Sequence, residues 1–535
     1  MRRGAPLFVI GLFLGIGLLL AGCATGQGAG GPERSGTVQV AFVATNDFHG
    51  GLLSSTPSWA RGDTVGGAAV LAGYIEGTRA RYPGAVVWLD GGDVMQGTLI
   101  SNLTRGRTTV RVLDAMGLDA AAVGNHEFDW SVDTLRARME DAEFAWLSAN
   151  VFEKATGERP AWLQPTAWLE RAGLRIAVIG ASTIQTPATT MPEYAAPYEF
   201  RDIADVVNEL VPGLRAEGAD LVVLAVHAGA IADSSNVYYG EIVDAARRIE
   251  DLDLIVSGHT HSFVETVENG IPIIQARAHG TAVGTVVLTY DRASRRVVDH
   301  AMEVTTTYAR DVTPAPAIAA LVEGYREEVR EIAERPIATL AGDVLRGDRG
   351  EEWPMGNLIA DAQRSATGAR ISVMNPGGVR AELRAGPISF ADVYQVQPFQ
   401  NTLVVMELTG AQVAELLEAG VADRIGHVSG VRFSYDPTLP YGDRVRDAAL
   451  EDTTEPLVAD GEPVHPEERY TVVVNSFLAA GGDTYGFLKD VEGATNTGIV
   501  DSDVLADYLG AAAQPVTYAA PDRITPLAPW PAGSE

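Results

Sequence analysis

Hydrophobic and polar positions divide the chain into two parts that alternate in a similar way. In residues 38–305, short apolar runs alternate with amphipathic stretches. The apolar runs are 38–44, 85–89, 120–123, 174–179, 221–226 and 254–256. Hydrophobic residues at helical spacing lie between several of these runs, over 67–81, 132–141 and 203–217. Short buried strands that alternate with helices predict a layered α/β domain over residues 38–305.

A charged segment separates this part from the next. Residues 314–334 are mostly polar, but Ile318, Leu321, Val322 and Tyr325 form an apolar stripe at helical spacing. We therefore expect a linker helix within residues 306–335, ended by Pro336.

A second α/β or α+β domain is expected over residues 336–527. The pattern predicts helices over 355–367 and 409–419, with strands over 371–374, 402–408 and 470–474. Residues 528–535 contain Pro and Gly, and we expect them to form a disordered tail.

The first residues have the order of an export signal. Arg2 and Arg3 precede a short apolar stretch over 7–20, and Leu20-Ala21-Gly22-Cys23 follows. Because Cys23 is the only cysteine, this sequence resembles a bacterial lipobox; the alternative is an ordinary signal peptide with a chance cysteine. The resemblance implies a signal peptide over 1–22, a lipid on Cys23 and a flexible tether over 23–37. The protein would then be exported and lipid-anchored to the cell envelope, in the periplasm or on the outer surface.

Composition and charge limit the classes of partner that this protein can have. A chain of 535 residues is too long for one core, and a single cysteine rules out a disulfide framework. The formal net charge of −30 disfavours nucleic acid polymers and anionic membranes, so the lipid is the only expected membrane contact. A site for an anionic small molecule must therefore supply its own positive charge. Oligomeric state does not follow from the sequence.

Residues that can bind metal follow the apolar runs of the first half. The segments are Asn46-Asp47-Phe48-His49, Asp90-Gly91-Gly92-Asp93, Gly124-Asn125-His126-Glu127-Phe128-Asp129, His227 and Ser257-Gly258-His259-Thr260-His261. Because strand carboxyl ends meet at one edge of an α/β sheet, we expect these side chains to converge. Carboxylates, imidazoles and an amide oxygen suit divalent ions such as Zn²⁺ or Mn²⁺.

These segments resemble the signature of the calcineurin-like metallophosphoesterases, and their order is similar to that of the bacterial 5'-nucleotidase/UDP-sugar hydrolase family. The resemblance implies a four-layer α/β sandwich that binds two divalent ions. One ion would be held by Asp47, His49, Asp93 and His261, and the other by Asp93, Asn125, His227 and His259. It also implies that His126 and Asp129 form a catalytic dyad. The other histidines, His279, His300, His427 and His465, are expected to be structural.

Loops of the second half carry groups that can bind a nucleotide. Arg349, Asn375 and Arg380 offer polar contacts, Phe399 and Phe477 offer rings that can stack on a base, and Asp483 can accept hydrogen bonds from ribose. Each phenylalanine could instead simply pack in the core. The surrounding segments resemble the 5'-nucleotidase C-terminal domain, which implies these six residues as substrate contacts.

The resemblance implies hydrolysis of nucleoside 5'-monophosphates by in-line attack of a metal-bound hydroxide. It also implies a domain rotation that carries the substrate to the metals. Two enzyme alternatives share the metal site: a 2',3'-cyclic phosphodiesterase/3'-nucleotidase, and a pyrophosphohydrolase of UDP-sugars or NAD. A non-enzymatic surface lipoprotein that binds metal or nucleotide is the alternative of another class.

Overall fold

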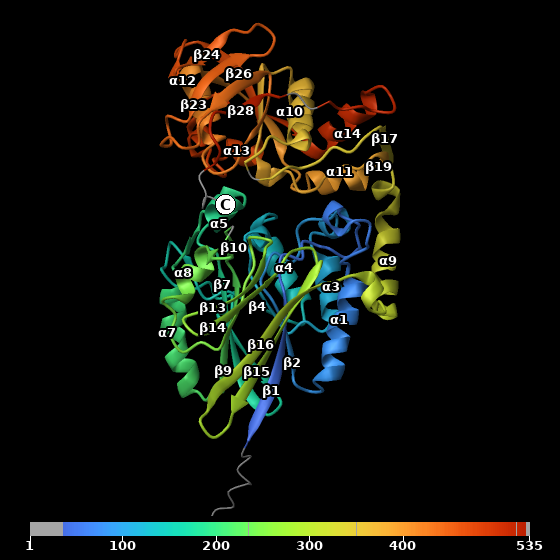
Figure 1. Ribbon diagram of the computed structural model, residues 1–535, viewed down its shortest axis with the longest axis vertical. Helices are drawn as coiled ribbons and strands as arrows, with labels where there is room; N and C mark the ends of the chain where they lie inside the picture. The colour runs from blue at the N-terminus through green and yellow to red at the C-terminus, as the bar shows by residue number, and fades with distance from the viewer. Residues whose placement is uncertain (1–35, 234, 349, 520–521, 531–535) are drawn as a thin grey trace, which may run out of the picture.

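The computed structural model describes residues 36–530, apart from 234, 349 and 520–521. Two domains lie end to end along the long axis, and α9 (Pro316–Ala333) runs along one side between them (Figure 1). The predicted signal peptide, Cys23 and nearly all of the tether lie outside the described residues. Within the part of the chain that the structure describes, no helix has the length and apolarity needed to cross a membrane.

The N-terminal domain is built on two six-stranded sheets. The first contains, in spatial order, β16 (Arg296–Thr306), β15 (Ala282–Asp291), β1 (Thr37–Thr45), β2 (Val86–Asp90), β3 (Ala120–Ala122) and β4 (Ala145–Leu147). The second contains β13 (Phe263–Glu268), β14 (Ile271–Ala276), β12 (Leu254–Val256), β9 (Leu221–His227), β7 (Leu174–Ser182) and β6 (Thr166–Arg171). The central strands of both sheets are parallel, which explains their continuous apolar runs.

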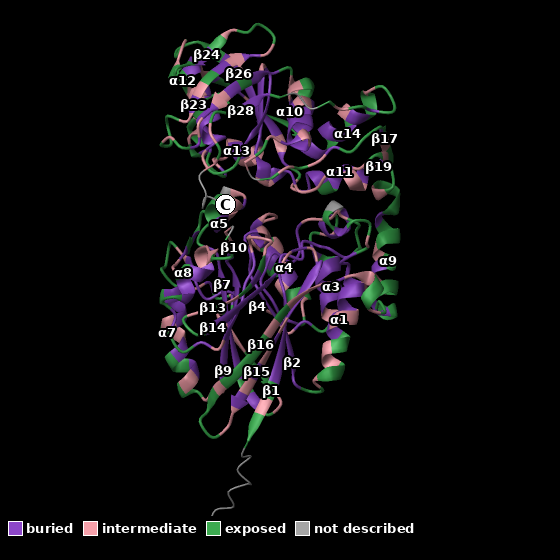
Figure 2. Cartoon of the chain, in the orientation of Figure 1, coloured by how far each residue is buried: buried purple, intermediate pink, exposed green. Residues whose placement is uncertain are grey.

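Helices cover the outer face of each sheet. On the first sheet lie α1 (Ala68–Arg81), α3 (Arg107–Met116) and α4 (Val132–Asp141); on the second lie α7 (Ile203–Ala216) and α8 (Glu241–Ala246). Between the sheets, residues such as Phe42, Leu89, Val178 and Val223 form a fully buried layer. The domain is therefore the expected four-layer α/β sandwich, with its buried residues concentrated along the strands (Figure 2).

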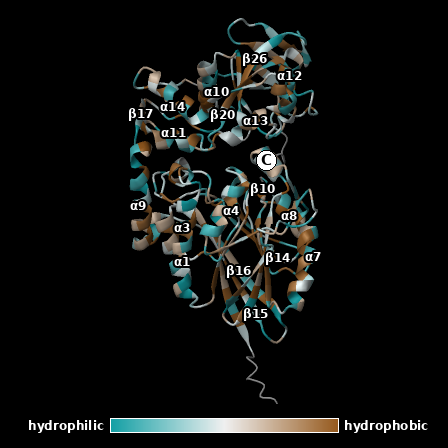
Figure 3. Ribbon diagram, turned by 180° about the vertical axis from the view of Figure 1, so that it is seen from behind, coloured by the Kyte–Doolittle hydropathy of each residue, from teal (hydrophilic) through white to brown (hydrophobic). Residues whose placement is uncertain are grey.

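The C-terminal domain contains two five-stranded sheets. One has the order β21 (His427–Ser429), β18 (Ile371–Met374), β26 (Arg469–Asn475), β20 (Thr402–Thr409) and β27 (Thr495–Val500). The other has the order β25 (Glu462–Pro463), β24 (Pro456–Ala459), β23 (Val445–Leu450), β22 (Val431–Tyr435) and β28 (Ile524–Pro526). The helices are α10 (Pro354–Thr367), α11 (Phe390–Val396), α12 (Gly410–Ala419), α13 (Ser476–Ala479) and α14 (Asp501–Ala511). Hydrophobic segments again lie in the interior of the domain (Figure 3).

Shorter elements complete the chain. They are α2 (Leu99–Asn102), α5 (Thr186–Thr189), α6 (Pro192–Ala195), β5 (Val151–Glu153), β8 (Tyr198–Phe200), β10 (Ile231–Ala232), β11 (Tyr238–Tyr239), β17 (Pro336–Leu340), β19 (Gly386–Ser389) and the 3₁₀ turns Ser58–Ala60, His126–Phe128, Ala309–Asp311, Pro376–Gly378 and Gly486–Asp490.

Trp530 lies in the tail that was expected to be disordered from residue 528. Its indole nitrogen donates a hydrogen bond of 3.1 Å to the hydroxyl of Tyr435, and its ring packs against the core of the C-terminal domain. The indole thereby covers apolar surface and finds a hydrogen-bond acceptor. Residues 531–535 lie outside the described part.

Candidate metal centre and nucleotide cavity

The metal-ligand candidates lie at the carboxyl ends of five parallel strands. Most lie on the loops that follow β1, β2, β3 and β12, and His227 is the last residue of β9; these strands belong to two different sheets. Five candidates, Asp47, His49, Asp93, His259 and His261, have positive φ angles between 49° and 81°. Non-glycine residues rarely adopt this conformation, and such strain concentrates at functional sites.

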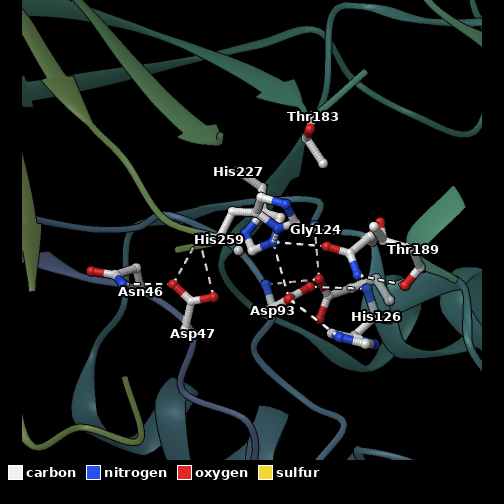
Figure 4. A network of polar contacts seen from close by, with 12 residues as sticks. Asn46, Asp47, Asp93, Gly124, His126, Thr183, Thr189, His227 and His259 are labelled. Atoms are coloured by element: carbon white, nitrogen blue, oxygen red, sulfur yellow. Dashed lines mark hydrogen bonds and ion pairs between the residues drawn. The ribbon is translucent and has the colours of Figure 1, made fainter. Parts of the chain in front are cut away.

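One group of ligand atoms consists of Asp47, His49 and His261, whose ligand atoms lie within 4.8 Å of one another. The Nε2 atoms of the two histidines are 3.2 Å apart, and Nε2 of His261 lies 3.2 Å from Oδ1 of Asp47. Asp47 is fully buried, and its carboxylate is oriented by Nδ2 of Asn46 at 2.6 Å (Figure 4).

A second group consists of Asp93, Asn125, His227 and His259. Figure 4 shows Asp93, His227 and His259 close together. Nε2 of His227 lies 3.0 Å from Oδ2 of Asp93 and 3.0 Å from Oδ1 of Asn125. Nδ1 of His259 lies 3.3 Å from the same Nε2 atom. Asp93 also lies 3.9 Å from His49 of the first group, so it stands between the two groups.

The donor chemistry of both groups fits divalent ions. Nδ1 of His49 lies 2.7 Å from the carbonyl of Gln96, and Nδ1 of His227 lies 2.8 Å from the carbonyl of Gly91. A protonated Nδ1 donates to the carbonyl and leaves the Nε2 lone pair facing the ligand group. Burial lowers the pKa of His49 well below its usual value and that of His259 to about 3, so both rings are neutral, as ligands must be.

Asp93 and His227 form a buried pair. Burial raises the pKa of Asp93, but His227 and His126 outweigh it and bring the pKa well below its usual value. Burial lowers the pKa of His227, but Asp93 outweighs it and raises the pKa to about 10. A proton shared by Asp93 and His227 can be replaced by a metal ion, because a metal ion displaces protons from the side chains that bind it.

His126 and Asp129 are joined directly. Nδ1 of His126 lies 2.8 Å from Oδ2 of Asp129, and the hydroxyl of Thr190 donates to Oδ1 of Asp129 at 2.8 Å. Nε2 of His126 points toward the second ligand group, 4.0 Å from Oδ2 of Asp93. Burial lowers the pKa of His126, but Asp129 and Asp93 outweigh it and raise the pKa above its usual value. The two carboxylates therefore favour the charged form of the ring.

One cavity of about 700 Å³ contains groups from both domains, and its size is in the range of small-ligand sites. Its lining includes Asp93, Asn125, His126, Asp129, His259 and His261 from the first domain, and Asn375, Arg380, Phe399, Phe477 and Asp483 from the second. The second domain approaches the metal-ligand candidates closely, since a guanidinium nitrogen of Arg380 lies 3.2 Å from Nε2 of His49. The ring centroids of Phe399 and His126 are 5.4 Å apart.

Hydrogen bonds hold the polar groups of the second domain in place. Nδ2 of Asn375 donates to Oδ2 of Asp483 at 2.7 Å, and Nδ2 of Asn475 donates to Oδ1 of Asn375 at 2.9 Å. Burial raises the pKa of Asp483 above its usual value. The loops that carry these residues are thus fixed to one another at the cavity wall.

Comparison with known proteins assigns both halves of the chain. Residues 40–263 match the family model of the calcineurin-like phosphoesterases, and residues 336–490 match that of the 5'-nucleotidase C-terminal domain. Protein UshA of Escherichia coli (strain K12) is 30% identical over an alignment that covers 89% of this chain and 92% of that protein. The chain belongs to the 5'-nucleotidase family. It is therefore a metallophosphoesterase, a hydrolase of phosphate esters.

Other members of the 5'-nucleotidase family are similar to this chain over both domains. A 5'-nucleotidase of Vibrio cholerae is 30% identical, with 92% of this chain and 94% of that protein aligned. The crystal structure of a 5'-nucleotidase precursor from Thermus thermophilus superposes with a TM-score of 0.81 at 29% identity, covering 92% of this chain and 99% of that chain. This chain therefore contains both domains that the family models describe.

The structure adds cavity residues that the sequence analysis did not select. Arg346, Arg424 and Trp353 line the cavity, whereas Arg349, the predicted contact, lies outside the described residues. The guanidinium of Arg346 lies 5.0 Å from the Trp353 ring centroid. Nothing in the local pattern separates Arg346 from other surface arginines, so its position depends on the folded loop.

His279, expected to be structural, lies beside two of the metal-ligand candidates. Its ring centroid is 5.4 Å from that of His49 and 5.9 Å from that of His261. Its φ angle of 57° matches those of the predicted ligands. His279 also follows a strand end, at β14, and this shared position is the sequence signal that could have drawn attention to it.

Proposed function

We propose that this enzyme releases phosphate from nucleoside 5'-monophosphates with the help of two divalent metal ions, of which Zn²⁺ and Mn²⁺ suit the ligands best. The observation that carries the proposal is the shared cavity, in which the metal-ligand candidates and the nucleotide-binding candidates face one space. When bound, the ions would activate water and neutralise charge on the phosphoryl oxygens.

The chain's own residues have distinct roles in this proposal. Asp47, His49, Asp93 and His261 would hold one ion, and Asp93, Asn125, His227 and His259 the other, since these side chains form the two groups described above.

His126 would donate a proton to the leaving oxygen or stabilise the transition state. The raised pKa of His126 and its contact with Asp129 support this role, because Asp129 fixes the ring and favours its charged form. Arg380, close to His49, would contact the phosphate.

The remaining cavity residues would bind the nucleoside. Phe399 and Phe477 would stack on the base, and Asp483 would accept hydrogen bonds from ribose while Asn375 holds its carboxylate. Arg349 stays a candidate substrate contact from the sequence alone.

The test is phosphate and nucleoside release from a set of substrates with Mn²⁺, with Zn²⁺ and with chelator. The set contains AMP, 3'-AMP, 2',3'-cyclic AMP, UDP-glucose and NAD. We expect chelator-sensitive adenosine release from AMP, with kcat about 10²–10⁴-fold lower in His126→Ala and metal binding unchanged. Preference for the cyclic, 3' or pyrophosphate substrates would replace the proposed substrate, and inactivity on all of them with metal bound would refute the proposal.

We also propose that the protein is exported and held at the cell envelope by a lipid on Cys23, since the segment before this residue resembles a lipobox. Incorporation of labelled fatty acid that disappears in Cys23→Ser is the expected result; label retained in that variant would contradict the proposal.

A further inference from the structure

Gln96 contacts both the metal centre and the substrate loop of the other domain. It follows Asp93 by three residues, on the loop that leads to α2. Its backbone carbonyl lies 2.7 Å from Nδ1 of His49. Its side-chain Nε2 donates a hydrogen bond of 3.3 Å to the carbonyl of Pro398, the residue before Phe399. Gln96 thus lies between a metal-ligand candidate and a base-stacking candidate.

In the described part of the chain, only one of the two polar side-chain atoms of Gln96 has a hydrogen-bond partner. The residue is 1% exposed, and its Oε1 atom has no hydrogen-bond partner in the described part of the chain. A buried polar atom without a partner costs stability, so an apolar side chain of similar size would suit the fold better. The presence of an amide here is therefore best explained by the bond that it makes across the domain boundary.

Tyr394 takes part in a hydrogen bond across the same domain boundary that does not involve Gln96. Its hydroxyl accepts from Nδ2 of Asn102 at 3.2 Å, and the same Nδ2 donates to the carbonyl of Pro398 at 2.8 Å. Asn102 itself is unsuitable as a control, because its Oδ1 accepts from the backbone nitrogen of Gly97, in the peptide unit that contains the Gln96 carbonyl. Tyr394→Phe removes only the hydroxyl and therefore provides a matched control for Gln96.

We propose that Gln96 is a positioning residue that couples the seating of the Phe399 loop to the orientation of His49. When Pro398 is in place, its carbonyl holds the Gln96 side chain, and the Gln96 carbonyl then holds the His49 ring with Nε2 toward the metal site. The proposal rests on the proposed function in one respect, that the Phe399 loop moves into place when a nucleoside binds.

Energetic coupling of this kind is reciprocal, so a nucleoside must tighten metal binding by the factor by which metal tightens nucleoside binding. The measurement is the apparent affinity of the whole protein for Mn²⁺, by calorimetry, with and without saturating adenosine. In the unmodified protein we expect adenosine to tighten Mn²⁺ binding by about fivefold or more. Gln96→Met, which keeps the size but cannot donate, should reduce this factor to about one, whereas Tyr394→Phe should keep most of it.

Three outcomes would overturn the proposal: no effect of adenosine on the unmodified protein, coupling retained in Gln96→Met, or equal loss in both variants. Equal loss in both variants would show that the coupling depends on domain contact in general and not on Gln96. Gln96→Leu repeats the test if the methionine variant does not fold. Because the measurement uses binding alone, failure to hydrolyse AMP would count against the proposed function and leave this inference to be judged by the Mn²⁺ titrations.

Discussion

At the residue scale, Asp501 is an acid that the fold buries without a basic partner among the described residues. It is 1% exposed at the start of α14, where Oδ1 accepts from the backbone of Ser502 at 2.8 Å. Burial raises the pKa of Asp501 to about 8, although hydrogen bonds from Ser502 and Asn401 act against this. Asn401 lines the cavity, so this buried acid supports a cavity loop.

The sign of the pKa shift predicts how stability depends on pH. The folded-state pKa of Asp501 lies above its unfolded value. The contribution of Asp501 to the free energy of unfolding is therefore fully present below about pH 4 and is lost as pH rises through 8. Asp501→Asn should remove this loss. The free energy of unfolding of the variant minus that of the unmodified protein should therefore be at least about 1 kcal/mol larger at pH 8 than at pH 5. Urea unfolding at both pH values measures the difference, and a pH-independent difference would contradict the prediction.

At the scale of elements, α13 and the loop after it hold one of the two cavity rings. The side chain of Asn475 accepts from the backbone of Leu478 at 2.9 Å and so caps the helix that carries Phe477. Gly482 lies directly against the ring, since a Cβ atom there would be 2.4 Å from Cζ of Phe477. Only glycine leaves room for the ring in this position.

Gly482→Ala should therefore displace Phe477 and weaken base stacking. Because stacking contributes about 1–3 kcal/mol per base, we expect KM for AMP to rise by about tenfold. Hydrolysis of p-nitrophenyl phosphate, which has no nucleobase, should be unchanged. Gly486→Ala, at the start of the 3₁₀ turn that follows this loop, is the control, since a Cβ atom there meets nothing within 4 Å. An unchanged KM for AMP in Gly482→Ala would show that the ring does not bind the base.

At the scale of the whole molecule, the cavity is complete only while the two domains are together. The backbone nitrogen of Asp483 donates to the carbonyl of Ala188 on α5 at 3.3 Å, which joins a substrate loop to the catalytic domain. If the domains rotate during turnover, as the family resemblance implies, this contact must break and form again in each cycle. The domain rotation stays a prediction, and it can be tested at this contact.

A disulfide across this contact should stop turnover. Cysteines in place of Ala188 and Thr484, in a Cys23→Ser background, lie on the two segments joined by that hydrogen bond. We expect phosphate release from AMP to fall by more than about tenfold on oxidation and to return on reduction, with Mn²⁺ binding unaffected. Full activity of the oxidised protein would argue against domain motion in the catalytic cycle.

Much of the local structure was predictable because it depends on spacing along the chain. The helix expected over 132–141 and the strand expected over 371–374 agree with α4 and β18, since the first has hydrophobic residues at helical spacing and the second is a short, fully buried run. Composition does not reveal that Tyr435 and the core offer a place for the indole ring of Trp530. The place of His279 beside His49 and His261 likewise comes from the fold, and only its position after a strand end could have suggested it.

The sequence by itself determined the chemistry of the ligand set, the alternation of strands and helices, and the two-part organisation of the chain, because each follows from residue type and local spacing. Only the tertiary structure decided which groups share a cavity. Sheet order brings five loops from two sheets to one centre, and the domain contact places Arg380 beside His49 and Pro398 beside Gln96. These contacts join residues roughly 300 positions apart, and nonlocal packing rather than local pattern sets them.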